Sequence, residues 1–309
     1  MDNLLFNPQE GKTILEPEGK GEGYWIGASS IFYDEEFEKF YLYVRIRNPR
    51  PKKGKVLPSD THRGYKCQIL ESSNGTDFKV IWEMGKKDIN VKSIEGASMI
   101  KIQDDYHLFF SYESNAIIPR WQIKKIIAED PSSFDSNKIQ KIKWNLPRFH
   151  RLSIKDPIVT LFNDEIHLYI DYFRFWKKPW GSSGLLTSKD GISFKWNGDV
   201  FVNLKDCKWA SYMTRLTSIF ESNNQYFGFF DGTDQESGLC EEKSGLLTGS
   251  SPKNLKIQSL KEPAYYSDFG KGSCRYLFGI KHENELWVYY EFTEKQGEHV
   301  LKMIKLKDL

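Results

Sequence analysis

The hydrophobic pattern of this chain consists of short apolar segments separated by polar turns, and one arrangement of them recurs. In its clearest copy, residues 158–162 and 166–172 are largely apolar and aromatic, and the polar turn Asn163-Asp164-Glu165 separates them. Segments rich in β-branched and aromatic residues on either side of such a turn predict a β-hairpin. The same pattern recurs in four further pairs of segments: residues 29–34 with 40–44, 98–102 with 106–110, 217–221 with 225–230, and 276–280 with 286–290.

The hairpins recur about every 60 residues, a period typical of an array of structural repeats. Further strand-like segments lie between them: 67–72 with 78–82, 121–128 with 139–142, 184–187 with 192–196, and 245–248 with 255–257. Each repeat is therefore predicted to form four antiparallel strands, the blade of a β-propeller. The last repeat has one outer strand, residues 300–306, so residues 12–15 are predicted to supply its fourth strand. The predicted fold is an all-β, five-bladed β-propeller forming a single domain over residues 1–309, without a helix of any length.

Composition and charge narrow the function classes. The chain carries 44 Lys and Arg against 42 Asp and Glu, a net charge of +2, and this balance does not favour a nucleic-acid partner. The short basic segment 50–55 is interpreted as a solvated loop. No signal-peptide pattern and no apolar run near the roughly 20 residues of a membrane span is visible. We therefore expect a cytoplasmic protein without a membrane partner. Because the four cysteines are scattered, we expect buried free thiols and no disulfide framework.

The geometry of a propeller brings particular strand ends together. The first strand of each blade starts, and the second strand ends, at the same mouth of the central channel, so charged and aromatic residues at these positions are site candidates. The candidates at the starts are Trp25, Gly27, Ala28, Glu95, Gly96, Lys155, Asp156, Arg215, Cys274 and Arg275. Those at the ends are Arg45, Arg47, Tyr112, Glu113, Asp171, Tyr172, Asp231 and Glu291.

The chain resembles the five-bladed propeller glycosidases, above all glycoside hydrolase family 43, with relatives in families 32, 68, 117 and 130. The resemblance rests on the motifs Lys155-Asp156-Pro157-Ile158-Val159 and Glu95-Gly96-Ala97-Ser98-Met99, on the turn at residues 188–194, and on the repeat pattern. It implies a glycoside hydrolase that acts on an oligo- or polysaccharide. In the family, an Asp-Pro in the third blade tunes the general acid and a Glu-Gly-Pro supplies it. Asp156 therefore resembles the tuning aspartate, and Glu95 resembles the acid.

Two positions depart from the family pattern. The family's first blade opens with an aspartate that acts as base, whereas the matching stretch here is Gly27-Ala28-Ser29-Ser30. The family's acid falls in the fourth blade, where this chain has Met213-Thr214-Arg215-Leu216, and Glu95 lies in the second blade. Either a rearranged set of acids cleaves the sugar, or the fold serves another task.

Glycoside cleavage requires a protonated carboxyl that protonates the leaving oxygen and an ionised partner that acts as base or nucleophile. Glu95 and Asp156 start adjacent inner strands, so we predict that they form the catalytic pair. Candidates for a third acid are Asp171, Glu113 and Asp231. The other interpretation is that each carboxylate pairs with an arginine at the mouth.

Arginines and tryptophans near the mouth are candidates for substrate binding: Arg45, Arg47, Arg215, Arg275, Trp25, Trp176, Trp180 and Trp209. Guanidinium groups can bind an anionic sugar, or a phosphate co-substrate of the kind that the family 130 phosphorylases use. Alternatively, they neutralise the carboxylates at the mouth. Exposed tryptophan rings suit the apolar face of a sugar. No His or Cys spacing predicts a metal, so we expect no cofactor, although a structural calcium ion stays compatible with the sequence.

The sequence therefore predicts a glycoside hydrolase with a carbohydrate as its partner. Two alternatives stay open. One is a phosphate-dependent glycoside phosphorylase of the same fold. The other is a non-catalytic propeller that binds a glycan or a protein at its mouth.

Overall fold

The computed structural model describes residues 2–49, 63–118, 120–150, 153–174 and 179–307, and in these ranges the protein is all-β, as predicted. Helical structure there is limited to single 3-10 turns, among them η1 (Asp2–Leu4), η2 (Pro8–Glu10), η4 (Ser136–Lys138), η6 (Leu204–Asp206) and η7 (Glu236–Gly238). None of the helices in the described part of the chain has the length and apolar character needed to cross a membrane.

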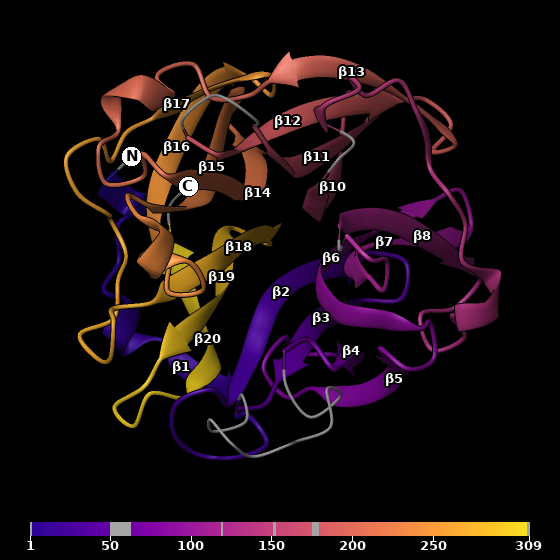
Figure 1. Ribbon diagram of the computed structural model, residues 1–309, viewed down its shortest axis with the longest axis horizontal. Helices are drawn as coiled ribbons and strands as arrows, with labels where there is room; N and C mark the ends of the chain where they lie inside the picture. Colours follow the sequence, from indigo (N-terminus) through magenta and orange to yellow (C-terminus); the bar gives the residue numbers. More distant parts are fainter. Residues whose placement is uncertain (1, 50–62, 119, 151–152, 175–178, 308–309) are drawn as a thin grey trace.

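The strands fall into five units in which consecutive strands pair antiparallel, and Figure 1 shows the units arranged around a common centre. Unit 1 contains β2 (Trp25–Asp34), β3 (Lys39–Arg47), β4 (Lys66–Ser72) and β5 (Lys79–Gly85). Unit 2 contains β6 (Val91–Ile102), β7 (Asp105–Ser114) and β8 (Trp121–Ala128). Unit 3 contains β10 (Ile154–Phe162), β11 (Glu165–Phe173), β12 (Gly181–Ser188) and β13 (Ser193–Asp199).

The remaining strands form the last two units. Unit 4 contains β14 (Met213–Ser222), β15 (Gln225–Thr233), β16 (Lys243–Ser251) and β17 (Asn254–Ile257). Unit 5 contains β18 (Cys274–His282), β19 (Glu285–Thr293) and β20 (His299–Lys307), and β1 (Lys12–Leu15) pairs antiparallel with β20. The N-terminal strand thus lies against β20, the last strand of the described chain.

Turn chemistry explains the tight hairpins inside the units. Asn163 and Asp164 form the two-residue connection between β10 and β11, with φ of 49° and 59°. Asn223 and Asn224 connect β14 to β15 in the same way, with φ of 51° and 58°. Two positive φ values in succession are the requirement of a type I′ turn, which Asn and Asp tolerate better than other non-glycine residues.

The first strands of the units lie next to one another. β2 contacts β6, β6 contacts β10, β10 contacts β14, β14 contacts β18, and β18 contacts β2. A cavity of about 500 Å³ is lined by residues from all five of these strands. Single parallel bridges, Trp25 with His299 and Gly181 with Met213, additionally connect unit 1 to unit 5 and unit 3 to unit 4.

Unit 2 differs from the prediction of four strands per blade. The segment expected to be its outer strand, residues 139–142, makes only a single bridge between Lys125 and Gln140 within the described residues. The chain then leaves the unit, because β9 (Lys143–Trp144) pairs in parallel with β13 of unit 3. The outer strand of unit 2 is thus replaced by a connection to the neighbouring unit.

Apolar side chains fill the spaces between neighbouring units. Phe40 of unit 1 stacks on Trp287 of unit 5 with ring centroids 5.0 Å apart, and Trp82 donates a hydrogen bond of 2.7 Å to the carbonyl of Phe134. The four cysteines are free thiols. The expectation that all four are buried is wrong for Cys240, which is half-buried in the loop between β15 and β16.

Candidate functional site

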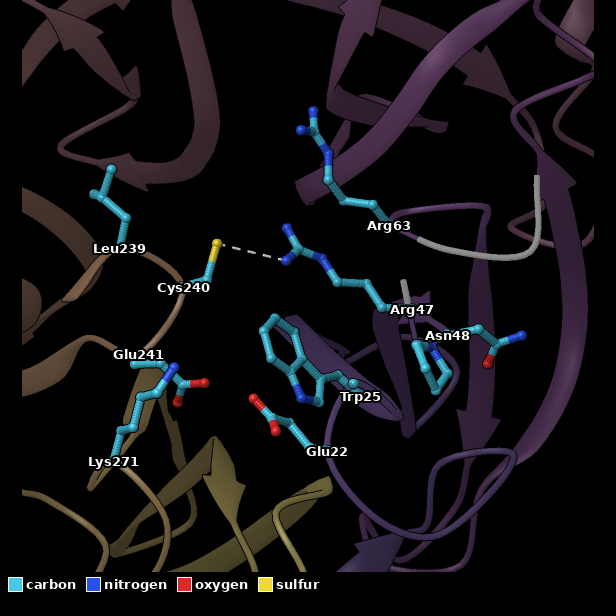
Figure 2. Close-up of a pocket in the computed structure, with 11 residues that line it drawn as sticks. Glu22, Trp25, Arg47, Asn48, Arg63, Leu239, Cys240, Glu241 and Lys271 are labelled. Atoms are coloured by element: carbon cyan, nitrogen blue, oxygen red, sulfur yellow. Dashed lines mark hydrogen bonds between the residues drawn. The ribbon is translucent and has the colours of Figure 1, made fainter. Parts of the chain in front are cut away.

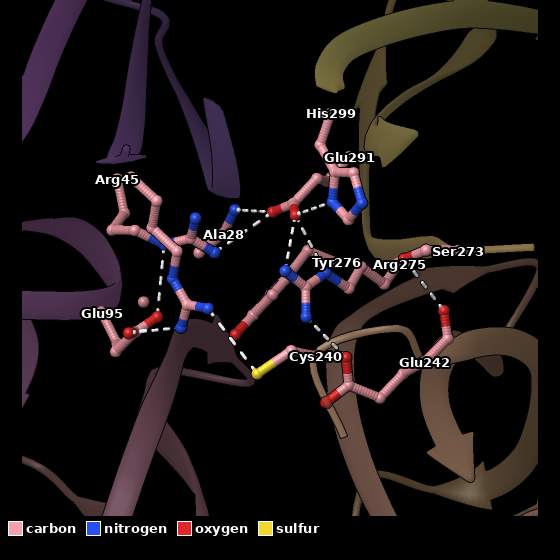
Figure 3. A network of polar contacts seen from close by, with 12 residues as sticks. Ala28, Arg45, Glu95, Cys240, Glu242, Ser273, Arg275, Tyr276, Glu291 and His299 are labelled. Carbon is pink, nitrogen blue, oxygen red and sulfur yellow. Dashed lines mark hydrogen bonds and ion pairs between the residues drawn. The ribbon is translucent and has the colours of Figure 1, made fainter. Parts of the chain in front are cut away.

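Charged side chains from the starts of the first strands and the ends of the second strands meet at one end of the units. Among the described residues, ion pairs connect five cations (Arg45, Arg47, Lys155, Arg215 and Arg275) with five carboxylates (Glu95, Asp156, Asp231, Glu242 and Glu291). We call this set the ion-pair network, and Figure 3 shows its part around Glu291. All members except Lys155 are buried, and burial is tolerated because each charge has a partner of opposite sign.

Each first strand contains an irregularity where it enters this region. The register shifts between Gly27 and Ser30, Ile94 and Ala97, Lys155 and Ile158, Leu216 and Ser218, and Arg275 and Phe278. Ala28, Asp156 and Tyr276 adopt positive φ values of 49°, 50° and 53° at these shifts. Bulges of this kind redirect a side chain out of the regular alternation and are common beside active sites.

Glu291 connects units 1 and 5. Its Oε1 accepts hydrogen bonds from Nε and Nη2 of Arg275 at 2.9 and 2.6 Å and lies 2.7 Å from Nδ1 of His299. Its Oε2 accepts from the backbone N–H of Ala28 at 3.0 Å and from Arg45 at 3.3 Å. Burial alone would raise the pKa of Glu291, but these cations outweigh it and hold the pKa well below its usual value.

Glu95 is also held as a carboxylate. Arg47 donates to its Oε1 at 2.6 Å, Arg45 lies 3.2 Å from its Oε2, and the Ser93 hydroxyl donates at 3.1 Å. Burial opposes ionisation, but Arg47 and Arg45 together bring the pKa of Glu95 far below its usual value. A general acid needs a raised pKa, so this environment does not support the predicted role of Glu95 as proton donor.

Asp156, at the start of β10, lies near Glu95. Arg215 donates to its Oδ2 at 2.8 Å, and the Lys155 ammonium lies 3.2 Å from the same oxygen. The amide of Gly96 donates to Oδ1 at 3.3 Å, and a Cβ at position 96 would stand 2.9 Å from that oxygen. Burial acts to raise the pKa of Asp156, but Lys155 and Arg215 outweigh it, so the pKa lies below its usual value.

Three of the four predicted substrate-binding arginines are enclosed. Arg45, Arg215 and Arg275 are at most 2% exposed. Arg215 also bridges to Asp231 at 2.6 Å and stacks on the Tyr276 ring at 3.9 Å. Because the guanidinium groups of these three arginines pair with carboxylates, the geometry does not support their direct contact with a substrate. It fits the other interpretation, that the arginines neutralise the carboxylates at the mouth.

Arg47, the fourth arginine, lines a cavity of about 430 Å³ together with Trp25 and Cys240 (Figure 2). Trp25 stacks on His299 at 4.3 Å between ring centroids, and the Arg47 guanidinium lies 5.0 Å from the Trp25 ring. Cys240 reaches the cavity from the loop between β15 and β16, with its Sγ 3.6 Å from Nη1 of Arg47. Trp25 and Arg47 thus border a cavity, although Arg47 is only 8% exposed and pairs with Glu95.

Asp171, at the end of β11, takes part in no ion pair among the described residues, unlike the five carboxylates of the ion-pair network. It is 5% exposed, and its Oδ1 has no hydrogen-bond partner among the described residues. Burial raises the pKa of Asp171 to about 8, although Lys155 and Arg215 act to lower it. The side chain lines a cavity of about 210 Å³ whose walls include Trp121 and Trp180. Asp171 therefore holds its proton to a higher pH than an ordinary aspartate does.

The remaining predicted residues occupy other positions. Trp180 stacks on Phe173 with ring centroids 5.7 Å apart. Trp209 donates from Nε1 to the Ser259 carbonyl at 2.6 Å and borders a third cavity, of about 440 Å³. Glu113 forms an ion pair with Arg63 outside the ion-pair network. Trp176 lies outside the described residues.

Glu242 and Cys240 are site residues that the strand-end argument missed. Both lie in the loop after β15 and directly before β16. Because β15 ends at the mouth, the antiparallel strand after it must start there, so the starts of third strands belong to the same set of positions. Among the described residues, no group of three or more His, Cys, Asp or Glu side chains is placed to hold a metal ion.

Comparison with known proteins gives a fold but no sequence relationship. No protein-family model matches the sequence, and no curated protein matches it significantly. A family 43 (GH43_1) enzyme from Xanthomonas citri complexed with xylotriose superimposes with a TM-score of 0.66 at 10% identity, over 96% of this chain and 91% of that chain. For the RS223 β-xylosidase the TM-score is 0.64 at 11% identity, over 97% and 96%.

A glycosidase of another family has a similar likeness. The family 32 β-fructofuranosidase of Bombyx mori superimposes with a TM-score of 0.63 at 15% identity, over 96% of this chain and 63% of that chain. At such identities the likeness concerns the fold alone. The chain has a β-propeller fold like that of the family 43 and family 32 glycosidases, as the sequence resemblance predicted.

Proposed function

We propose that the chain is a five-bladed β-propeller that hydrolyses glycosidic bonds, with Asp156 as the ionised carboxylate of its site. The cyclic order of contacts from β2 through β6, β10, β14 and β18 back to β2 supports five blades around one channel. The cavity that all five first strands line supports the same arrangement. The N-terminal strand β1 then joins the blade of β18 to β20 and leaves fewer open strand edges.

The position of Asp156 carries the functional proposal. It stands in a bulge at the mouth and is kept ionised by Lys155 and Arg215, and its ion-pair partner Lys155 lines a cavity with aromatic walls. An ionised carboxylate beside a site for a sugar ring is one of the two groups that glycoside hydrolysis requires. The similar structures include a β-xylosidase and an enzyme complexed with xylotriose, so xylosides are the first substrates to examine.

A phosphorylase is the less favoured activity of this fold. Phosphate would need guanidinium groups free to clamp it, whereas Arg45, Arg215 and Arg275 are enclosed and paired with carboxylates.

A non-catalytic glycan-binding propeller is the second candidate. The first-blade stretch where the resemblance implies a catalytic aspartate is Gly27-Ala28-Ser29-Ser30, and the backbone N–H of Ala28 donates to Glu291. Because this stretch contains no carboxyl group, the site has fewer acidic residues than the family 43 pattern implies. The aromatic cavities would still suit a sugar, so binding without turnover is the expected behaviour of this alternative.

A substrate panel separates the candidates. Aryl β-xylosides, xylotriose and sucrose are incubated with the purified protein, with and without phosphate. We expect release without phosphate, and an Asp156→Asn variant should lose at least about 100-fold in kcat/KM. Asp164→Asn, an exposed turn position in the same unit, is the matched control and should keep full activity. Binding of these sugars without turnover, or near-normal rates in Asp156→Asn, would contradict the proposal.

A further inference from the structure

Asp171 is a buried carboxyl at the mouth that stands outside the balanced set of ion pairs there. The five cations and the five carboxylates of the ion-pair network, within the described residues, compensate one another. Asp171 is a further buried carboxyl at the same end of the units and takes part in none of these ion pairs. An ionised carboxylate buried without a cation is far more costly than a neutral one, so its proton stays on.

The nearest cation in the strand ladder is directed elsewhere. Lys155 stands directly opposite Asp171 in the β10–β11 register, yet its ammonium lies 3.2 Å from Oδ2 of Asp156. Asp156 and Glu242 both act to raise the pKa of Asp171, which reinforces the effect of burial. The two aspartates are therefore electrostatically coupled neighbours in opposite protonation states.

Opposite protonation states in neighbouring carboxyls are the arrangement that acid and base catalysis requires. A pair whose environments push the two pKa values apart supplies a proton donor and an ionised partner at the same pH. Here Asp156 is the ionised member, and Asp171 is the protonated one, with a pKa of about 8. Glu95, whose pKa is lowered by Arg47 and Arg45 against the effect of burial, does not supply the proton.

The cavity beside Asp171 suits a sugar ring. Its walls carry mainly apolar and aromatic side chains: Trp121, Phe173, Trp180, Tyr212, Met213 and Leu239. Flat aromatic faces can cover the C–H face of a sugar, and Lys155 is the cation in the lining. The volume of about 210 Å³ is below the roughly 300–1,000 Å³ of drug-sized sites, so the cavity fits one ring rather than a long oligosaccharide.

We propose that Asp171 is the proton donor of this site and that the cavity it lines binds one sugar ring of the glycoside; the proposal rests on the hydrolase function above. The Asp171 proton passes to the glycosidic oxygen as the bond between that oxygen and the anomeric carbon breaks. Water supplies the hydroxyl group that the anomeric carbon gains. The second proton of that water restores the protonated carboxyl.

Leaving-group dependence tests the assignment. A proton donor matters for an alkyl glycoside, whose leaving alcohol needs the proton, and matters little for a dinitrophenyl glycoside. In Asp171→Asn we expect kcat/KM to fall by about 100-fold or more on the alkyl glycoside and by less than about 10-fold on the dinitrophenyl glycoside. Asp156→Asn should lose activity on both. Because Asn replaces a neutral carboxyl of the same shape, Asp171→Asn should fold, which thermal unfolding verifies.

The pH profile and the infrared spectrum provide independent measurements. The kcat/KM of the wild type on the alkyl glycoside should fall above about pH 8, and this decrease should be absent in Asp171→Asn. A protonated-carboxyl band at pH 7 should be present in the wild type and in Asp164→Asn but missing in Asp171→Asn. If Asp171→Asn lost kcat/KM equally on both glycosides, or if the protonated-carboxyl band survived in this variant, the role of Asp171 would be overturned. Neither result would contradict the hydrolase function. A wild type that cleaves no glycoside would overturn the hydrolase function itself, while the infrared band would still decide whether Asp171 is protonated.

Discussion

Lys155 and Asp171 are direct partners in the β10–β11 ladder, yet the Lys155 ammonium pairs with Asp156, its neighbour in sequence. In a regular strand successive side chains point to opposite faces and do not meet. The positive φ of Asp156, at the bulge between Lys155 and Ile158, breaks that alternation and allows the contact. One irregularity in the backbone thus lets Lys155 pair with Asp156, while burial raises the pKa of Asp171.

The protonation of Asp171 should appear in the stability of the protein. The folded-state pKa of about 8 lies above the ordinary aspartate value of 3.8, so between these pH values the unfolded chain releases a proton that the folded chain keeps. Raising the pH through this window therefore favours unfolding, with a limiting slope of about 1.4 kcal/mol per pH unit. Chemical denaturation from pH 5 to 8 should show this decline in the wild type and lose it in Asp171→Asn. Parallel curves for the two proteins would contradict a raised pKa.

Removal of Arg275 should destabilise the fold strongly. Its guanidinium neutralises Glu242 at 2.6 Å and Glu291 at 2.6 Å, so Arg275→Met leaves two buried carboxylates short of a partner. Breaking a buried ion pair in this way costs about 3–5 kcal/mol. Urea unfolding measures the change. Lys39→Ala, which removes a partly exposed pair with Glu71, is the control and should unfold nearly like the wild type. A loss in Arg275→Met no larger than in that control would show that the network is not structural.

The close approach of Gly96 to Asp156 should make that glycine essential for activity. In Gly96→Ala the new Cβ would lie 2.9 Å from Oδ1 of Asp156, so the carboxylate or the strand must move. A displaced catalytic group costs on the order of 100-fold in rate, with a smaller effect on substrate binding. Gly85→Ala is the control, because there the new Cβ meets a flexible side-chain oxygen of Asp88 at 3.3 Å. Equal kcat values in the two variants would exclude this role of Gly96.

Cys240 should be the most reactive thiol. Although burial acts to raise the pKa of Cys240, Arg47 outweighs it and lowers that pKa, and thiolates are the reactive form. Burial raises the pKa of Cys67 to about 12 and that of Cys207 to about 11. Native alkylation followed by mass spectrometry should modify Cys240 first, and Arg47→Gln should slow the reaction. Alkylation of Cys67 or Cys207 at the same rate would contradict this ranking.

Much of the fold could be predicted because hairpins depend on local chemistry. Alternating segments and polar turns such as Asn163-Asp164 specify where two adjacent strands begin and end, and the period of the hairpins indicates how many units the chain makes. The prediction of an outer strand at residues 139–142 was wrong. The pairing of an edge strand depends on segments outside its local sequence, and here the following strand, β9, pairs with unit 3.

The sequence by itself determined that Glu95, Asp156, Arg215 and Arg275 gather at one end of the units, since the position of a residue in its hairpin decides the end at which it lies. Only the tertiary structure decided which of these charges meet. Arg45 and Arg47 take Glu95, Lys155 turns to Asp156, and Asp171 is left with its proton. The reason is that a pKa depends on burial and on the charges that other units bring within a few ångströms. The spacing of residues along one strand predicts neither of these.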